Sequence, residues 1–242
     1  MQELRRLAVI DGSLGSLSSC RLTLAFKQWP RDWQVQPWVA GRAEGGILRE
    51  VRKGQAQHCG SNASLFCRAD GSMVFQVGTH FFFGLMELFG ERCVKRVRAD
   101  VRFADGPGGD RAEVAATGTL QLGAEAGAVA GLEIALDVRT DSKAGDIYEL
   151  ELVGERGSLM LKDFSRLERT APKRESLVQP GSYGRVESVT TLVEAVRGDG
   201  EARAGRGESA RGGLITARQG RNAQRVLDAV LASQGQWIDV SY

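Results

Sequence analysis

His80 is the residue of this chain best suited to proton-transfer chemistry. It is one of two histidines in 242 residues, and it follows Thr79 at the start of an apolar stretch that ends at Gly90. The hydroxyl of Thr79 can cap a helix, and Gly90 can end one in a left-handed conformation. A histidine in the first helical turn is close to the positive end of the helix dipole, which favours neutral imidazole at neutral pH. His80 is therefore either a general base beside a cavity or a packed, hydrogen-bonded core residue.

Motifs of several other enzyme classes are absent from the sequence. The glycine clusters at 106–109 and 205–213 lack the G-x-G-x-x-G spacing of a dinucleotide site. The sequence also contains no P-loop and no G-x-S-x-G elbow. His58, Cys59 and Cys67 have no convincing fourth ligand, so we expect no metal site.

The overall composition argues against two classes of binding partner, nucleic acids and membranes. The net charge of +2 is too small to predict a nucleic-acid or membrane-surface partner, and no apolar run approaches the ~20 residues that span a bilayer. The Gly/Arg/Glu-rich residues 198–213 carry both signs of charge, which favours a flexible solvated loop over an RNA-binding segment. The four cysteines show no paired spacing and the N-terminus shows no signal peptide. We therefore expect free thiols and a cytoplasmic globular protein.

The elements that must position His80 follow from periodicity and turn residues. Residues 2–10 predict the end of an amphipathic helix, and 79–89 predict a helix that is apolar nearly all round and therefore buried. Alternation predicts strands over 17–26, 93–103, 112–122, 129–139, 146–153, 157–162 and 237–240. Two further helices are predicted over 187–197 and after a capping box formed by Thr216 and Gln219.

These elements predict an α+β fold in a single domain over residues 1–242. Hairpin-sized gaps between consecutive strands indicate a large, mainly antiparallel sheet, because parallel neighbours would need long crossovers. We expect the helices to pack on one face of that sheet. The other face would then be a natural surface for a homo-oligomer.

Four segments, in a fixed order, carry motifs that a family of enzymes shares. They are a G-x-L-G turn in 10–15, a glycine pair followed by Ile-Leu in 45–48, Gly-Thr-His before an apolar helix in 77–90, and a closing helix and strand in 218–240. Together they resemble the C-terminal domain of the Gfo/Idh/MocA family of NAD(P)-dependent oxidoreductases. The resemblance covers nearly the whole chain.

The resemblance implies a function as well as a fold. In that family an N-terminal Rossmann domain holds NAD or NADP, and the C-terminal sheet domain contacts the substrate and forms the oligomer interface. It implies that His80 takes or gives the hydroxyl proton of a sugar or diol, with Trp33 and Trp38 as candidates to cover a sugar ring; packing under a loop is the alternative for these tryptophans. No Glu-Lys-Pro motif occurs, so we expect no cofactor site in this chain and no activity from it alone. The alternative function is a non-catalytic oligomerisation or binding module derived from such an enzyme.

Residues 51–76 interrupt the family's histidine motif. The family places an acidic residue four positions before the histidine, where this chain has Gln76. Deleting 51–76 joins Glu50 to Val77 and makes Glu50 that acidic companion of His80. Because valine codons begin with GT and Phe-Gln can be encoded TTYCAG, one hypothesis is a retained, in-frame intron. The other is a genuine surface loop.

Overall fold

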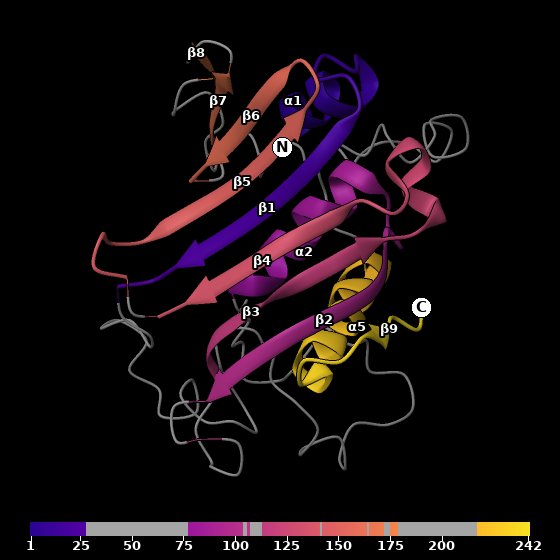
Figure 1. The fold of residues 1–242 in the computed structure, drawn as a ribbon, viewed down its shortest axis with the longest axis vertical. Coiled ribbons are helices and arrows are strands. Elements are labelled where there is room, and N and C mark those ends of the chain that lie inside the picture. Colours follow the sequence, from indigo (N-terminus) through magenta and orange to yellow (C-terminus); the bar gives the residue numbers. More distant parts are fainter. Residues whose placement is uncertain are drawn as a thin grey trace, which may run out of the picture.

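A nine-stranded sheet forms the centre of the protein in the computed structural model, as Figure 1 shows. The structure describes residues 1–27, 77–103, 106, 113–140, 142–163, 165–171, 175–178 and 217–242. The helical elements are α1 (Gln2–Arg5), the π-helical η1 (Arg6–Ile10), α2 (Val77–Phe89), the 3-10 helix η3 (Ala124–Val129) and α5 (Ala217–Ser233). The strands are β1 (Leu17–Ala25), β2 (Val94–Phe103), β3 (Glu113–Leu122), β4 (Glu133–Arg139), β5 (Ile147–Gly154), β6 (Gly157–Lys162), β7 (Arg166–Ala171), β8 (Glu175–Val178) and β9 (Ile238–Asp239).

The sheet is mainly antiparallel, as the sequence predicts. Its strand order is β8-β7-β6-β5-β1-β4-β3-β2-β9. Among the described strands one pair is parallel, β1 with β4, in which Leu22 is the partner of Leu136. The chain between these two strands passes through α2, β2 and β3, which gives the long connection that a parallel pair needs. Every other pair of neighbours is antiparallel.

Alternating side chains give the sheet one apolar face. On β1 the prediction of an inward row is confirmed, because Leu22, Leu24 and Phe26 are each at most 1% exposed. The register sets Leu22 between Leu136 of β4 and Leu150 of β5. Full burial of such a side chain contributes roughly 1.5–3 kcal/mol. This row therefore fixes the register, since a one-residue slip would expose it.

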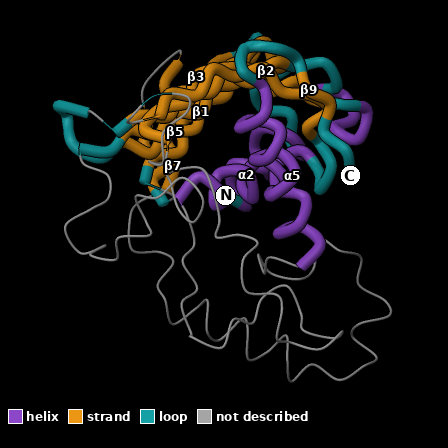
Figure 2. The backbone as a smooth tube through the Cα atoms, turned by 90° about the horizontal axis from the view of Figure 1, so that it is seen from below, coloured by secondary structure: helices purple, strands orange, loops and turns teal. Residues whose placement is uncertain are grey.

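The helices gather on that apolar face, which confirms the predicted α+β arrangement (Figure 2). The predicted stripe of α5 is buried at Ala223, Val226, Leu227 and Val230, each fully, and half-buried at Leu231. Helix α2 is buried on more than one side, as its nearly continuous apolar sequence predicts. Its buried residues are Phe81, Phe82, Leu85, Met86, Leu88 and Phe89. No described helix covers the opposite face of the sheet, which we call the open face.

The C-terminal segment ties α5 to the edge of the sheet. The backbone N–H of Ala99 on β2 donates to Ser233 Oγ at 2.7 Å, and Gly235 N–H donates to the Ala99 carbonyl at 2.8 Å. Strand β9 then pairs with β2, close to the predicted closing strand at 237–240. The segment carries the chain from the helical face to the sheet edge.

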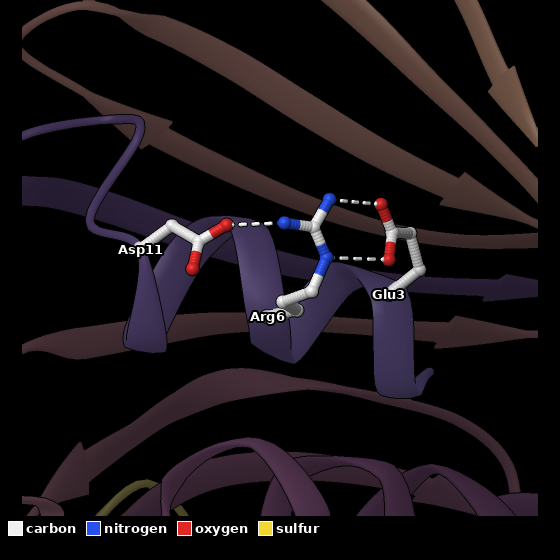
Figure 3. A network of polar contacts seen from close by, with 3 residues as sticks. All are labelled: Glu3, Arg6 and Asp11. Carbon is white, nitrogen blue, oxygen red and sulfur yellow. Dashed lines mark hydrogen bonds and ion pairs between the residues drawn. The ribbon is translucent and has the colours of Figure 1, made fainter.

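The N-terminal helical turn ends where the sequence predicts, at Asp11-Gly12. In Figure 3 Arg6 joins Glu3 and Asp11: its Nε and Nη2 donate to the two Glu3 carboxylate oxygens at 2.8 and 2.6 Å, and its Nη1 donates to Asp11 Oδ2. These groups are exposed, so the network adds little stability. No described helix combines the length and apolar character that a bilayer crossing requires.

Several predictions of elements need correction or are not tested. Strands β7 and β8 were not predicted, and residues 124–129 form η3 where a turn and the start of a strand were expected. The predicted helix over 187–197, the loop over 198–213, the cap at Thr216 and the insertion at 51–76 lie outside the described residues.

Candidate functional site

His80 lies in the first turn of helix α2. The predicted helix is present, but it begins at Val77, two residues earlier than predicted. Thr79 is therefore inside the first turn, and the prediction that it is the N-cap is wrong. The structure describes the backbone of His80 and not its side chain. Its backbone position keeps it at the positive end of the helix dipole.

The residue that follows His80 is anchored on the sheet by aromatic rings. Phe81 stacks on Tyr148 of β5, with ring centroids 6.0 Å apart and planes within 5°. Tyr148 also meets Phe26, at the end of β1, edge to face at 5.5 Å. Phe81 and Phe26 are buried. Such aromatic pairs contribute about 0.5–1.5 kcal/mol beyond area burial, so Tyr148 fixes where the first turn of α2 meets the sheet.

Asp146 adds polar contacts at the same place. The backbone N–H of Lys27 donates to Asp146 Oδ1 at 3.1 Å, and Tyr148 Oη donates to Asp146 Oδ2 at 3.5 Å, a long hydrogen bond. Lys27 is the last described residue before 28–76, and Phe81 lies shortly after that segment. The pair Asp146 and Tyr148 therefore joins the residues just after β1 to the first turns of α2.

Sequence reasoning missed the contacts of Tyr148 and Asp146. Tyr148 comes close to Phe26 because it is the register partner of Leu24 on β1, and that register joins segments more than a hundred residues apart. The alternation of residues 146–153 predicts which face Tyr148 occupies. It does not predict which strand lies beside it.

The far end of α2 is held by α5. Gly90 has φ +107° and its N–H donates to the Met86 carbonyl at 2.9 Å, so its predicted role as a left-handed helix end is confirmed. The carboxylate of Glu91, the next residue, forms an ion pair with Arg218, whose Nε lies 2.6 Å from Oε2. The Glu91 carbonyl accepts a hydrogen bond from Asn222 Nδ2 at 3.3 Å. Both ends of the helix that carries His80 are thus fixed against other elements.

The other predicted site residues lie outside the part of the chain that the structure describes. Trp33, Trp38 and Glu50 lie outside the described residues, so their roles as sugar platform and acidic companion are not tested. His58, Cys59 and Cys67 lie outside as well. Within the described part of the chain, no three His, Cys, Asp or Glu side chains cluster as a metal site would require.

Cys20 and Cys93 are free thiols in the core. Burial raises the pKa of the Cys20 thiol, and burial raises the pKa of Cys93 to about 12. A thiol is nucleophilic as the thiolate, so neither cysteine has the chemistry of a catalytic nucleophile at neutral pH.

The described fold does not match what a nicotinamide cofactor needs. Dinucleotide sites are built from parallel β-α-β units with a glycine-rich turn at the helix N-terminus. Here the parallel pair β1–β4 stands among antiparallel neighbours, and no described connection from strand to helix carries G-x-G-x-x-G. The described residues therefore do not fit NAD(P).

No protein-family model and no curated protein sequence matches the chain. Solved structures match it over nearly its full length. The WlbA dehydrogenase from Bordetella pertussis, bound to NADH and UDP-GlcNAcA, shares 15% identity at a TM-score of 0.58, over 99% of this chain and 60% of that one. Levoglucosan dehydrogenase, solved with NADH, shares 14% sequence identity at a TM-score of 0.62, and the match covers 98% of this chain and 62% of that one. An oxidoreductase from Thermotoga maritima shares 12% sequence identity at a TM-score of 0.59, and the match covers 98% of this chain and 57% of that one.

These matches define the class of fold. The chain shares its fold with a part of these oxidoreductase structures, and it spans about 60% of the length of each. Those structures are of the Gfo/Idh/MocA type. The resemblance to the C-terminal domain of that family, inferred from four motifs, is thus confirmed at the level of the fold.

Proposed function

We propose that this chain is the substrate-side and assembly part of an NAD(P)-dependent oxidoreductase acting on a CH–OH group of a sugar or diol. The observation that carries the proposal is the fold match over 98–99% of this chain to dehydrogenases solved with NADH. The nicotinamide would be held by a further part of the enzyme, corresponding to the length that these relatives have beyond the match. Without that part the chain is inactive alone.

In this proposal His80 moves the proton of the reacting hydroxyl. A neutral imidazole accepts the proton when the alcohol is oxidised, and imidazolium returns it when the carbonyl is reduced. The position of the backbone supports this role, because the first turn of α2 is the positive end of the helix dipole and favours neutral imidazole. The Phe81–Tyr148 stack would keep that turn in place.

The sugar or diol substrate class is drawn from the relatives. The WlbA dehydrogenase was solved with UDP-GlcNAcA, and levoglucosan dehydrogenase was solved with L-sorbose. Trp33 and Trp38 would then supply apolar surface for the carbon face of a sugar ring. Glu50 would be the acidic companion of His80 if residues 51–76 are excised. The buried free thiols of Cys20 and Cys93 fit a reducing, cytoplasmic location.

A second candidate is a non-catalytic assembly module. The open face of the sheet favours it, because an uncovered sheet face is a natural surface for a second copy of the chain. The two candidates differ in whether the helical face also carries chemistry, and a homo-oligomer through the open face would leave that face uncovered in either case.

Reading the gene separates the two candidates most directly. We expect an in-frame Rossmann-coding exon upstream in the genomic DNA, joined to this chain in transcripts. The retained-intron hypothesis further requires that codon 51 begins with GT, that codon 76 is CAG, and that spliced transcripts lack codons 51–76. Transcripts that begin at Met1 with no cofactor-coding region would leave the assembly module as the function.

A further inference from the structure

An exposed carboxylate lies close to the turn of α2 that carries His80. Asp146 comes just before β5 begins, and Tyr148, two residues later, stacks its ring on Phe81 at a centroid distance of 6.0 Å. Residues two apart along an extended chain point to the same side, so Asp146 continues the covered face past the end of the sheet. Asp146 is exposed, whereas Phe81 is buried. The carboxylate therefore lies where the core ends and a solute can reach it.

Two donors fix the orientation of the Asp146 carboxylate. The backbone N–H of Lys27 donates to Oδ1 at 3.1 Å, and Tyr148 Oη donates to Oδ2 at 3.5 Å. An ionised carboxylate has about four acceptor sites, more than these two donors use. A side chain that is already oriented loses less conformational entropy when a ligand binds it. Asp146 is thus a preorganised acceptor of hydrogen bonds.

Helix geometry places position 80 beside the sheet contact of α2 and not within it. Successive residues of an α-helix are about 100° apart around the axis. Phe81 and Leu85 are buried in the core, and position 80 is turned about 100° from the first and about 140° from the second. A molecule that reaches position 80 must therefore lie alongside the first turn of α2, at the end of the sheet where Asp146 is exposed.

Hydroxyl groups are the ligand groups that suit this carboxylate. An ionised carboxylate only accepts hydrogen bonds, so its ligand must supply donors. A metal ion would need further ligands, and no three His, Cys, Asp or Glu side chains cluster in the described part of the chain. The two oxygens of one carboxylate can accept from two neighbouring hydroxyls of the same molecule. Each such bond to a charged acceptor strengthens binding by roughly tenfold or more.

We propose that Asp146 binds a pair of neighbouring hydroxyls of the substrate, away from the carbon that reacts at His80. The inference rests on the proposed function and narrows its substrate class to polyols, which have one hydroxyl that reacts and two that Asp146 holds. In this role Asp146 determines specificity and takes no part in proton transfer. Its loss should therefore raise KM and change kcat little.

Binding of small polyols to the 242-residue chain tests the site without any turnover. Ligand-observed NMR measures the dissociation constants of myo-inositol and L-sorbose, with cyclohexanol as a probe that has the inositol ring and a single hydroxyl. We expect at least one polyol to bind with a dissociation constant on the order of 10 mM. Asp146→Asn, which loses the charge and one acceptor, should weaken that binding at least about tenfold. Cyclohexanol should bind the wild type and the variant alike.

A second variant and a matched control separate binding from folding. Asp146→Asn keeps an oxygen for the Lys27 N–H, and Asp146→Ala removes both acceptors and should lose at least as much affinity. Asp239→Asn changes an exposed aspartate on β9, at the β2 edge of the sheet, and should leave polyol binding unchanged. Circular dichroism and Tm confirm that each variant folds.

Kinetics of the complete enzyme separate this inference from the proposed function. Asp146→Asn should raise KM for the polyol at least about tenfold and leave kcat within about threefold. Polyol binding that survives in both Asp146 variants, or a wild-type chain that binds neither polyol up to about 100 mM, would overturn the inference and leave the dehydrogenase proposal standing. Polyol binding that depends on Asp146 in a protein without dehydrogenase activity would support the site and overturn the proposed function.

Discussion

The two faces of the sheet carry alternate residues of the same strands and differ in burial and in charge. On β4, Leu136 is 3% exposed and faces the helices, whereas its neighbours Ala135 and Asp137 point to the open face. The covered face is specified by burial, and it positions α2 and His80. The open face is specified by charge and side-chain size. Substitutions on the open face should therefore leave α2 and His80 in place.

The largest effect is expected from His80→Ala in the complete enzyme. Loss of a general acid/base lowers kcat by about 10²–10⁴, while Tm should change little. Steady-state kinetics and thermal unfolding measure the two quantities. His58→Ala, which removes the other histidine, is the matched control and should retain turnover. Unchanged turnover in His80→Ala would make His80 a core residue.

A matched pair of substitutions compares the two faces in stability. Leu136→Ala on the covered face should lower the free energy of unfolding by about 2–5 kcal/mol, because it leaves a cavity beneath the helices. Thr117→Ala, an exposed site on the open face of the neighbouring strand, should change it by about 0.5 kcal/mol or less. Urea denaturation measures both. Equal losses would contradict the stated difference between the two faces.

Tyr148 connects the covered face to the turn of α2 that carries His80. Tyr148→Leu removes the stack on Phe81, and we expect kcat of the complete enzyme to fall about tenfold or more with little change in KM, since small misplacements of a catalytic group are costly. Tyr148→Phe keeps the ring and should retain most of the turnover. If the two variants lose activity equally, the hydroxyl and its contact with Asp146 matter more than the ring.

A small effect on stability is expected from deleting residues 51–76. The deletion shortens the segment between Lys27 and Val77 by about half, which lowers the entropy cost of closing it by roughly 0.6 kcal/mol. The free energy of unfolding should rise by about that amount if 51–76 adds no packing. Chemical denaturation of the full and deleted chains measures it. A marked loss of stability would show that 51–76 is an integral part of the fold and would count against the retained intron.

Much of the fold could be predicted from sequence because its strands alternate clearly. Leu22 and Leu24 on β1, and the glycine-rich turns from 105 to 157, indicate strand positions within a few residues. β7 was missed because Leu167 is the one buried apolar residue among the side chains that the structure describes in this strand, and an alternating signal needs several. The parallel pairing of β1 with β4 depends on contacts more than a hundred residues apart, which periodicity cannot supply.

The candidate site was predicted in part for the same reason. The apolar run after His80 and the glycine at position 90 are local signals, and they locate α2 and its end. The N-cap was assigned to Thr79 because its hydroxyl is a common cap, yet the helix extends to Val77. The anchoring contacts of Tyr148 follow from tertiary register, so no local pattern could indicate them.

Titration of the purified 242-residue chain with NADH and NADPH tests the central claim most directly. The claim is that this fold supplies the substrate side and the assembly surface of a dehydrogenase and does not itself hold the nicotinamide. The enhancement of cofactor fluorescence and the heat of binding are measured together. We predict no saturable binding up to about 1 mM cofactor. Saturable binding with a dissociation constant of about 10 µM or lower would contradict the account.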